Sequence, residues 1–386
     1  MWRYYLLLLI ATICQHTFAQ TEVPVFISGE DGYKYYRIPA IIRMNSGKII
    51  AFSEGRVEHA GDFGHVNIVY KTSVDNGKTW SKIQIAAKND SLQASNSAPV
   101  VDNLDPAYPN GRIFLFYNTG NNHEYEIRKG NGYREVWYIT SEDEGQTWSV
   151  PVNITTQVHR LNQPAINPAY NSEEDWRAFA NTPGHALQLE YPPYTGRIYI
   201  GANRSEGVPK PNGRDYFAFG YYSDDHGKTF KTSQKVPLEG SNESMAAMIS
   251  DTELYLNSRN QQGNERCRII SRSVDGGHAW QSSVYDKNLP DPVNQGSVLS
   301  WKTGDQYILA VANASDTLRR DNLTLRLSKD KGKSWYLNHL IDKAPEGYSG
   351  DYTAYSDLVL INREKIGIIY EKDNYRKIVF TTIDLH

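Results

Sequence analysis

The stretch Ser73–Trp80, SVDNGKTW, is one of five copies of an eight-residue pattern in this chain. The other copies are SEDEGQTW from Ser141, SDDHGKTF from Ser223, SVDGGHAW from Ser273 and SKDKGKSW from Ser328. Each reads Ser-x-Asp-x-Gly-x-(Thr/Ser/Ala)-aromatic and follows a strand-like run such as NIVYKTS. Asp can accept hydrogen bonds from backbone amides and Gly can adopt a positive φ, so the pattern predicts a hairpin turn. We expect the aromatic residue to pack in the core.

A calcium site is the competing interpretation of these copies, because Asp-x-x-Gly resembles a fragment of a calcium-binding loop. An EF-hand loop also needs oxygen ligands at alternate positions and a closing glutamate. None of the five copies has that set. The repeated pattern therefore predicts architecture, and we expect the chemistry elsewhere in the chain.

The spacing of the copies predicts the fold class. Their central aspartates are 68, 82, 50 and 55 residues apart, and the segments between them contain short β-branched and aromatic runs bounded by Gly, Asn and Asp. Helical periodicity is nearly absent, with one short helix expected at Asn171–Phe179. Repeated β units at this spacing indicate an all-β, six-bladed β-propeller of about 61 residues per blade, with five box hairpins and a sixth blade that lacks the box.

The first residues suggest export. Residues 1–19 contain a basic residue, an apolar run from Leu6 to Ile13 and a small-residue exit, which is the form of a secretory signal peptide. The apolar run is shorter than the roughly 20 residues that a membrane span needs. We therefore expect residues 20–386 to form a single propeller domain that is secreted or periplasmic, with no membrane span.

Cysteine content and charge limit the function classes. Cys14 lies within the signal-peptide stretch, so Cys267 is the remaining thiol, and a hydrophobic core must hold the fold without an intrachain disulfide. We expect Cys267 to be a small buried residue. The formal net charge of −3 gives no indication of nucleic acid as a partner. HExxH, Gly-rich phosphate loops, G-x-S-x-G and Cys/His metal spacings do not occur, so we expect neither cofactor nor metal.

The segment YKYYRIPAII (Tyr33–Ile42), taken with the boxes, resembles the sialidase (exo-α-neuraminidase) superfamily of six-bladed propellers with Asp-box repeats, glycoside hydrolase family 33-like. The resemblance runs from about Val25 to the C-terminal end. In that family an arginine of this motif binds the substrate carboxylate, which implies that role for Arg37. From the residues alone, the favoured interpretation of Arg37 is a strand-end arginine that reaches solvent or pairs with a structural carboxylate.

Two more arginines complete the clamp that the resemblance implies. ELYLNSRN resembles the family strand ending in Asn-x-Arg, which implies Arg259, and LRRDNLTLRLS resembles Arg-x-Asn-Leu. The spacing to Asn322 favours Arg320 over its neighbour Arg319. Forked, permanently charged donors bind a planar anion bidentately. Such a cluster is mutually repulsive when empty, so it predicts an acidic ligand.

The resemblance also implies the catalytic residues. In SEGRVEHAGDFG, Asp62 corresponds to the acid that protonates the leaving oxygen, and Arg56 to a further pocket arginine. GDYTAYSDLVLI resembles the family's Ala-Tyr-Ser-Asp-Leu segment, which implies Tyr355 as nucleophile, and Glu243 in GSNESMAAMI corresponds to the base for its phenol. Without the resemblance, Asp62 would be interpreted as a solvated loop carboxylate and Glu243 as a possible turn carboxylate.

A tyrosine nucleophile has a physical reason. A substrate with a carboxylate on its reacting carbon would repel an Asp or Glu nucleophile, and sialidases are the known exception that uses a phenol. Because a phenol has a pKa of about 10, Glu243 must remove its proton during attack. Tyr355 would attack while Asp62 protonates the departing group, and Asp62 would then activate water, so that two inversions give retention.

Weaker correspondences concern the rim and supports of the pocket. Gln295 in NQGSVLSW corresponds to a pocket-lining glutamine, and Glu54 is expected to hold Arg37 or its neighbours. TPGHALQL resembles a family stretch, but Thr182 replaces a glycine and residues 162–176 look inserted. The resemblance therefore does not predict the far rim of the pocket.

The resemblance implies an exo-α-sialidase that acts with retention on sialylated glycoproteins, glycolipids or oligosaccharides. Three alternatives stay open: a trans-sialidase, a hydrolase of deaminated sialic acid on the same scaffold, and a non-catalytic sialic-acid-binding propeller.

Overall fold

The computed structural model describes residues 22–385, so the predicted signal peptide at residues 1–19 lies outside the described residues. The described chain is all-β, with short helices α1 (Glu124–Arg128) and α2 (Thr155–Val158) and the 3-10 helix η1 (Pro211–Gly213). None of the helices between residues 22 and 385 combines the length and apolarity that crossing a bilayer requires.

The strands form five hydrogen-bonded sheets. The largest contains β2 (Tyr35–Arg43), β3 (Ile49–Arg56), β4 (Val66–Ser73), β5 (Gln84–Ala87), β6 (Gln93–Asp102), β7 (Arg112–Gly120), β8 (Arg134–Ser141) and β9 (Val152–Asn153). The next contains β10 (Trp176–Asn181), β11 (Leu187–Gln188), β12 (Ile198–Glu206), β13 (Tyr216–Ser223) and β14 (Lys231–Thr232). The third contains β15 (Ser241–Met248), β16 (Leu254–Asn260), β17 (Cys267–Ser273) and β18 (Ser282–Pro290).

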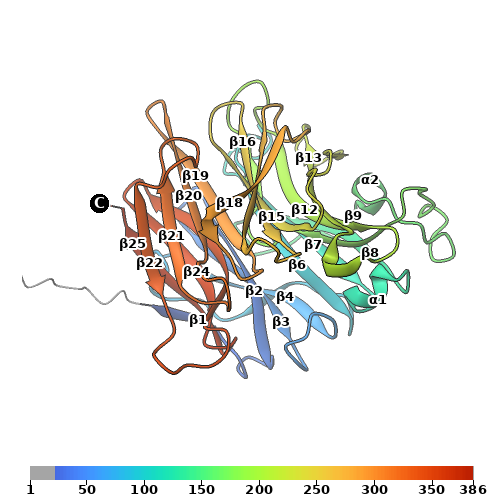
Figure 1. The fold of residues 1–386 in the computed structure, drawn as a ribbon, viewed down its shortest axis with the longest axis horizontal. Helices are drawn as coiled ribbons and strands as arrows, with labels where there is room; N and C mark the ends of the chain where they lie inside the picture. Colours follow the sequence, from blue (N-terminus) through green and yellow to red (C-terminus); the bar gives the residue numbers. More distant parts are fainter. Residues whose placement is uncertain (1–21, 386) are drawn as a thin grey trace, which may run out of the picture.

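The last two sheets have four strands each. One contains β19 (Gly296–Thr303), β20 (Gln306–Ala314), β21 (Leu323–Ser328) and β22 (Leu337–Asp342). The other contains β23 (Thr353–Asn362), β24 (Lys365–Lys372), β25 (Lys377–Asp384) and β1 (Val23–Ile27). Because β1 pairs antiparallel with β25, the two ends of the described chain share one sheet (Figure 1).

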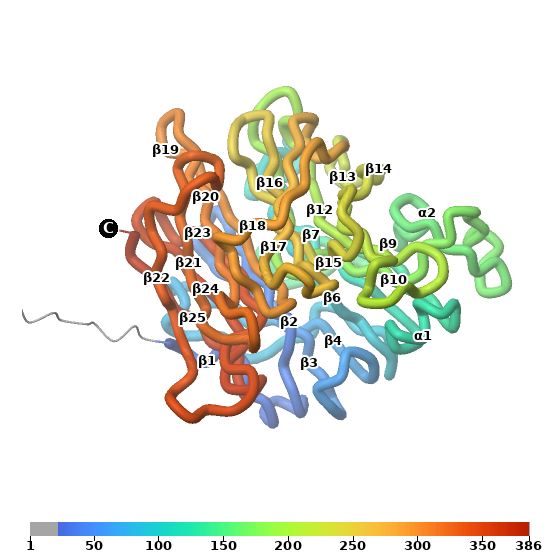
Figure 2. Tube along the Cα trace, in the orientation of Figure 1, coloured from blue at the N-terminus to red at the C-terminus, as the bar shows by residue number. Residues whose placement is uncertain are grey.

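The sheets are arranged as a β-propeller, which confirms the predicted all-β propeller class. Strand β2 packs against β6 and β23, β19 packs against β23 and β15, and β15 packs against β12. Figure 2 shows β2, β6 and β15 in the central part of the molecule. The eight-stranded sheet is held together between β4 and β6 by a single parallel pair, Val66 and Gln93. The hydrogen-bonded sheets thus number five, and the expected count of six blades stays a prediction.

The five repeated boxes form hairpin turns, as predicted. They connect β4 with β5, β8 with β9, β13 with β14, β17 with β18 and β21 with β22. In the first box the Ser73 hydroxyl donates to Asp75 Oδ1 at 2.8 Å and accepts from the Gly77 amide at 2.9 Å. Asp75 in turn accepts from the Thr79 hydroxyl at 2.6 Å and the Thr79 amide at 3.0 Å. These hydrogen bonds lower the pKa of Asp75 to about 2.

The box glycines press against residues of another sheet or, for Gly145, of a distant strand in the same large sheet. Gly77 has a φ of +84°, and a Cβ there would lie 2.1 Å from the ring of Phe380 in β25. Trp80, the aromatic residue of the same box, packs edge-on against that ring at 5.6 Å. In the other four boxes the glycine lies against Ile50, Phe114, Tyr199 or Tyr255 of the preceding strands. Glycine is therefore required both for the backbone conformation and for the contact between neighbouring sheets.

The structure contradicts the predicted helix and confirms the predicted burial of Cys267. The expected helix at Asn171–Phe179 is wrong, because Trp176 begins strand β10. Trp176 and Phe179 pack edge-on against Phe219, and this burial favours a strand over a helix. Cys267 is buried as expected, and burial raises the pKa of its thiol.

Candidate active site

Three of the predicted residues, Arg37, Glu243 and Tyr355, lie at irregular positions of strands near the centre. Strand β2 shifts register just after Arg37, β15 shifts around Glu243 and β23 shifts around Tyr355. A β-bulge re-aims side chains that a regular strand would direct to alternate faces. Register shifts in three separate strands therefore direct these side chains to one end of the propeller.

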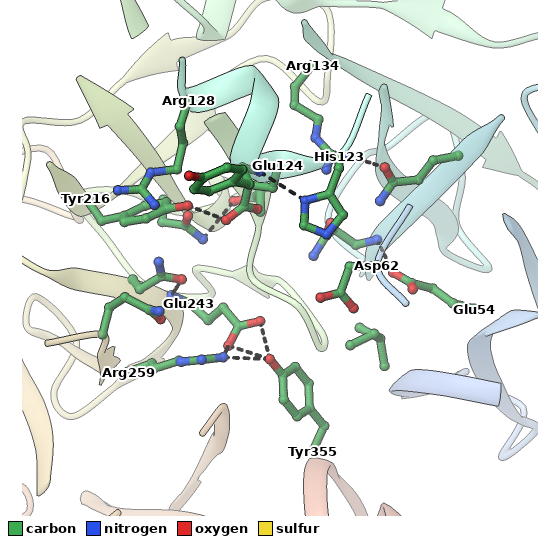
Figure 3. A pocket seen from close by; sticks show the side chains of 18 of the residues that line it. Glu54, Asp62, His123, Glu124, Arg128, Arg134, Tyr216, Glu243, Arg259 and Tyr355 are labelled. Atoms are coloured by element: carbon green, nitrogen blue, oxygen red, sulfur yellow. Dashed lines mark hydrogen bonds and ion pairs between the residues drawn. The ribbon is translucent and has the colours of Figure 1, made fainter. Parts of the chain in front are cut away.

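A cavity of about 270 Å³ lies at this end, and Figure 3 shows the side chains around it. Five of the predicted residues line it: Arg56, Asp62, Glu243, Arg259 and Tyr355. The rest of the lining was not predicted as such and is mostly polar, comprising Ile38, Glu54, Gln93, Asn96, His123, Glu124, Tyr125, Arg128, Arg134, Ala180, Asn203, Tyr216, Asn242 and Gln261. Such a lining suits a ligand with many hydroxyl and carbonyl oxygens.

Tyr355, Glu243 and Arg259 are in mutual contact. The Tyr355 hydroxyl lies 2.7 and 2.9 Å from the two carboxylate oxygens of Glu243. Arg259 Nη1 donates to Tyr355 Oη at 2.8 Å and to Glu243 Oε2 at 2.8 Å. Burial, followed by the Glu243 carboxylate, raises the pKa of Tyr355 despite the nearby arginines. The phenol is therefore neutral at neutral pH and requires a base such as Glu243 before it can attack.

Arg37 is held by a carboxylate that the sequence analysis missed. Its Nε lies 2.7 Å from Glu371 Oε1, and both side chains are buried. Glu371 also accepts from the amides of Ile38 at 2.8 Å and Tyr355 at 3.2 Å. Burial disfavours the charged guanidinium, but Glu371 outweighs it, so the pKa of Arg37 lies above its ordinary value. Glu371 thus fixes Arg37 and the backbone of Tyr355 together.

Glu54 does not hold Arg37, which corrects one of the two expectations for this residue. It lies opposite Arg37 in the β2–β3 register, but its carboxylate accepts from Arg56 Nη2 at 2.6 Å and from Arg56 Nε at 3.1 Å. Arg56 is two residues along the same strand and so shares a face with Glu54, whereas Glu371 already satisfies Arg37.

Arg56 also reaches the predicted acid. Its Nη1 lies 2.9 Å from Oδ1 of Asp62, whose side chain is 69 % exposed at the mouth of the cavity. Partial desolvation by the surrounding cavity walls acts to raise the pKa of Asp62, but the Arg56 guanidinium outweighs it and holds that pKa below its usual range. Asp62 is therefore ionised at neutral pH in the empty pocket.

The structure favours Arg320 over Arg319. The Arg320 guanidinium lies 5.4 Å from the centre of the Tyr355 ring and donates to Tyr375 Oη at 3.1 Å. Arg319 is more exposed and pairs with Asp321 at 2.6 Å. Arg37 lies 5.6 Å from the Tyr355 ring centre. The three predicted clamp arginines therefore surround Tyr355, although Arg259 is the member that lines the cavity.

Gln295 lies outside the cavity lining. Its amide nitrogen donates to the carbonyls of Ser356 at 3.0 Å and Pro183 at 3.2 Å, and its oxygen accepts from the Ser356 amide at 3.0 Å. Gln295 thus supports the backbone next to Tyr355 and does not present its amide to a ligand.

The expected insertion at residues 162–176 contributes no lining residue. Instead it supports the segment that does line the cavity: Gln163 donates to the Gly130 carbonyl at 3.1 Å, close to α1. Its effect on the far rim is therefore indirect.

The site residues that were not predicted differ in how strongly the sequence signals them. Glu371 stands in the apolar strand KIGIIYEK, and a lone carboxylate there signals a buried partner, as Arg37 did. Tyr375, which stacks under Arg37 at 3.9 Å, is one of 27 tyrosines and carried no such signal. The far wall of Glu124, Arg128 and Tyr216 depends on tertiary contacts between α1 and β13.

One cluster outside this cavity offers metal-binding side chains. Ligand atoms of Asp102, Asp105 and His226 lie within 4.8 Å of one another. Asp102 Oδ2 lies 2.9 Å from His226 Nδ1, and Asp105 pairs with Arg112 at 3.1 Å. Protein partners therefore already occupy these groups.

Comparisons with known proteins identify the family of this chain. Residues 49–368 match the BNR repeat-like domain. A sialidase of Micromonospora viridifaciens is 28% identical over 376 residues, which cover 91% of this chain and 52% of that protein, so this chain spans about half of its relative's length.

Two solved structures share the fold. A Hadza microbial sialidase is 22% identical with a TM-score of 0.76, covering 94% of this chain and 68% of the other. A leech intramolecular trans-sialidase, complexed with 2,7-anhydro-Neu5Ac, is 16% identical with a TM-score of 0.71, covering 95% of this chain and 71% of the other. With five box turns, the propeller arrangement and a match over residues 49–368, this chain belongs to the BNR repeat-like family within the sialidase superfamily.

Proposed function

We propose that this protein is an exo-α-sialidase that releases terminal α-linked sialic acid from glycoconjugates with retention through a tyrosyl-glycosyl intermediate. The contact between the Tyr355 hydroxyl and Glu243, at 2.7 Å, carries the proposal. A buried neutral phenol with a carboxylate base in a cavity is the arrangement that nucleophilic attack by tyrosine requires. The sialidase relatives support the substrate class.

The arginines determine how the substrate enters. Arg37, Arg259 and Arg320 converge on Tyr355 from three strands or loops. Carboxylates already pair with Arg37 and Arg259, but the forked guanidinium groups have further donors that can bind an anion beside the phenol. A sugar carboxylate bound there would bring the anomeric carbon to which it is attached next to Tyr355 Oη. The clamp thus provides both affinity and orientation for attack.

Proton transfer is divided between two carboxylates. Glu243 takes the phenolic proton as Tyr355 attacks, and Arg259, which contacts both groups, stabilises the developing negative charge. Asp62 protonates the leaving oxygen. A leaving group at the mouth of the cavity would displace water from Asp62, and desolvation favours the protonated form that a general acid needs. Asp62 then serves as the base for water in the second step.

The proposal includes a single exported six-bladed domain at residues 20–386. Dividing the large sheet at its one parallel pair, Val66 with Gln93, yields six four-stranded groups when the short β11 is set aside. Five of these groups carry one box turn each, and the sixth is completed by β1. The form of residues 1–19 supports export to the medium or periplasm.

The test is turnover of an aryl α-glycoside of N-acetylneuraminic acid by the parent protein, with the products followed by NMR. Fluorophore release with the α-anomer formed first supports the proposal. Formation of a sialylated lactose when lactose is added, or of a 2,7-anhydro sugar, would indicate a transferase. A preference for the deaminated donor would change the substrate. Binding of sialic acid without release from any donor would contradict hydrolysis and leave the non-catalytic propeller.

A further inference from the structure

One cation in the cavity has no counterion. Four arginines line the cavity: Arg56, Arg128, Arg134 and Arg259. Three of them pair with a carboxylate, namely Arg56 with Glu54, Arg128 with Asp215 and Arg259 with Glu243. Within residues 22–385, Arg134 has no carboxylate oxygen within the 4.0 Å of an ion pair.

Arg134 is held in place by a row of residues across three strands. Gln93 of β6, Gly120 of β7 and Arg134 of β8 are direct neighbours in register. A Cβ on Gly120 would lie 2.9 Å from Arg134 Nη1 and 3.0 Å from its Cδ, so the glycine leaves the space in which the arginine lies. Arg134 Nη1 donates to Gln93 Oε1, and Gln93 Nε2 donates to Ser95 at 2.8 Å. The row is thus built to hold the guanidinium in one orientation.

The buried position of the Arg134 guanidinium is energetically unfavourable without a ligand. Arg134 is 3 % exposed, its Nε has no hydrogen-bond partner among the described residues, and burial lowers the pKa of its guanidinium. A buried charge that lacks a paired group is destabilising, which is why Arg37 in the same molecule pairs with Glu371. Arg134 lines the cavity and, within the described part of the chain, only its Nη1 is hydrogen-bonded, to Gln93, so an acceptor oxygen of a ligand in the cavity would give the guanidinium a second partner.

We propose that Arg134 is a specificity-determining contact that donates to an oxygen of the sugar acid at the end remote from its carboxylate. Figure 3 shows Arg134 on the side of the pocket opposite Tyr355 and Arg259. The proposal rests on the proposed function for the kind of ligand. The oxygen is neutral, because the ligand's carboxylate is bound at the clamp, and it comes from either the N-acyl carbonyl or a hydroxyl of the side chain.

The test measures binding by NMR titration with three free acids. These are N-acetylneuraminic acid, the deaminated acid with a hydroxyl in place of the acylamino group, and the N-acetylated acid with a shortened side chain. Arg134→Met should weaken binding of N-acetylneuraminic acid about ten- to a hundredfold, the loss of a charge-assisted hydrogen bond. One of the other two acids lacks the oxygen that Arg134 contacts, and Arg134→Met should change the affinity for that acid by less than about twofold. Which acid is insensitive to the substitution therefore shows which oxygen is bound.

Two further variants separate this contact from general effects. Lys129→Met removes one charge from the exposed surface of the segment after α1 and should leave all three affinities unchanged. Gly120→Ala keeps Arg134 but displaces its guanidinium, and should reproduce the selectivity of Arg134→Met. Circular dichroism and the thermal midpoint verify that each variant is folded.

The outcomes are distinct from those of the proposed function. Equal weakening of all three acids by Arg134→Met, or no weakening at all, overturns the role of Arg134. If the parent protein binds the acids selectively through Arg134 but releases no sugar, the role of Arg134 is supported and the proposed hydrolase activity is overturned. A parent that binds none of the three acids overturns both proposals.

Discussion

The box turns and the pocket use carboxylates in opposite ways. In the first box, Asp75 is satisfied by Ser73 and by Thr79, all within seven residues of chain. In the pocket, Glu371 meets Arg37 across 334 positions of sequence and Glu243 meets Tyr355 across 112. A turn of this kind can form wherever its eight residues occur, whereas the pocket exists only once the propeller has closed.

The partners differ as well as the distances. Box aspartates accept from hydroxyls and backbone amides, which are neutral and locally available. Pocket carboxylates accept from guanidiniums that are themselves buried, so the loss of either member leaves an uncompensated charge. Disruption should therefore be severe and specific in the pocket, and mild but repeated in the turns.

The largest expected effect is on chemistry. Tyr355→Phe removes the proposed nucleophile while keeping the ring, so kcat should fall by more than about a thousandfold with little change in the affinity for the free acid. Steady-state kinetics and NMR titration measure the two quantities. Tyr336→Phe, at an exposed tyrosine directly after the fifth box, is the matched control and should behave as the parent. Retention of a tenth of the activity by Tyr355→Phe would rule out the covalent mechanism.

The second effect is on stability at the pocket. Glu371→Gln leaves the buried Arg37 without a counterion, and the free energy of unfolding should drop by about 3–5 kcal/mol. Denaturant titration provides the measurement. Glu239→Gln, which removes a carboxylate paired with Arg214 at the surface, should change little. If the two variants were equally stable, the pair between Arg37 and Glu371 would contribute no more than a surface pair.

The third effect brings the turns into the comparison. Gly77→Ala combines an unfavourable positive φ with a clash against Phe380, and should destabilise by about 2–5 kcal/mol. Gly32 has a nearly identical φ of +88° with nothing within 4 Å of its Cβ position, so Gly32→Ala should cost only about 1–2 kcal/mol. Equal losses in thermal or chemical unfolding would show that the box glycine has no role between the sheets.

The smallest expected effect is on how steeply the free energy of unfolding depends on pH. Hydrogen bonds from the box lower the pKa of Asp75 from 3.8 to about 2, so the unfolded chain binds more protons between these values. Stability should accordingly fall as the pH falls from about 4 to about 2. Asp75→Asn should make this decline shallower. Asp275→Asn should do so less, because Ala279 replaces the threonine that donates a hydroxyl to Asp75. Unfolding titrations from pH 5 to pH 2 measure the slope for both variants. If Asp75→Asn lost stability as steeply as the parent protein, the hydrogen bonds of the box would not be the cause of the decline.

Local patterns predicted more of the fold than of the site. The five boxes were recognisable because each turn is complete within eight residues, and they indicated β hairpins at the positions where hairpins occur. The helix expected at Asn171–Phe179 was wrong because its two aromatic residues gain more by packing on β13 than the segment gains from helical propensity.

For the site, sequence motifs identified residues but not partners. Tyr355, Glu243 and Arg259 were named from separate motifs, and the fold brings them within hydrogen-bond distance. Glu54 was expected to hold Arg37 or its neighbours, and it pairs with Arg56, because Glu371 from the neighbouring sheet already pairs with Arg37.

The sequence by itself determined the repeating β architecture, the box turns and the residue types available for the chemistry, because these depend on short-range hydrogen bonding and on local motifs. Only the tertiary structure decided which charges neutralise one another and which of the arginines lining the cavity stays unpaired. Arg134 illustrates the difference: in sequence it is an ordinary strand residue, and its isolation follows from its neighbours Gly120 and Gln93 once three strands are in register, which leave no described carboxylate within ion-pair distance. Charge pairing acts through space over a few ångströms, and distances of that kind are determined only when the propeller closes.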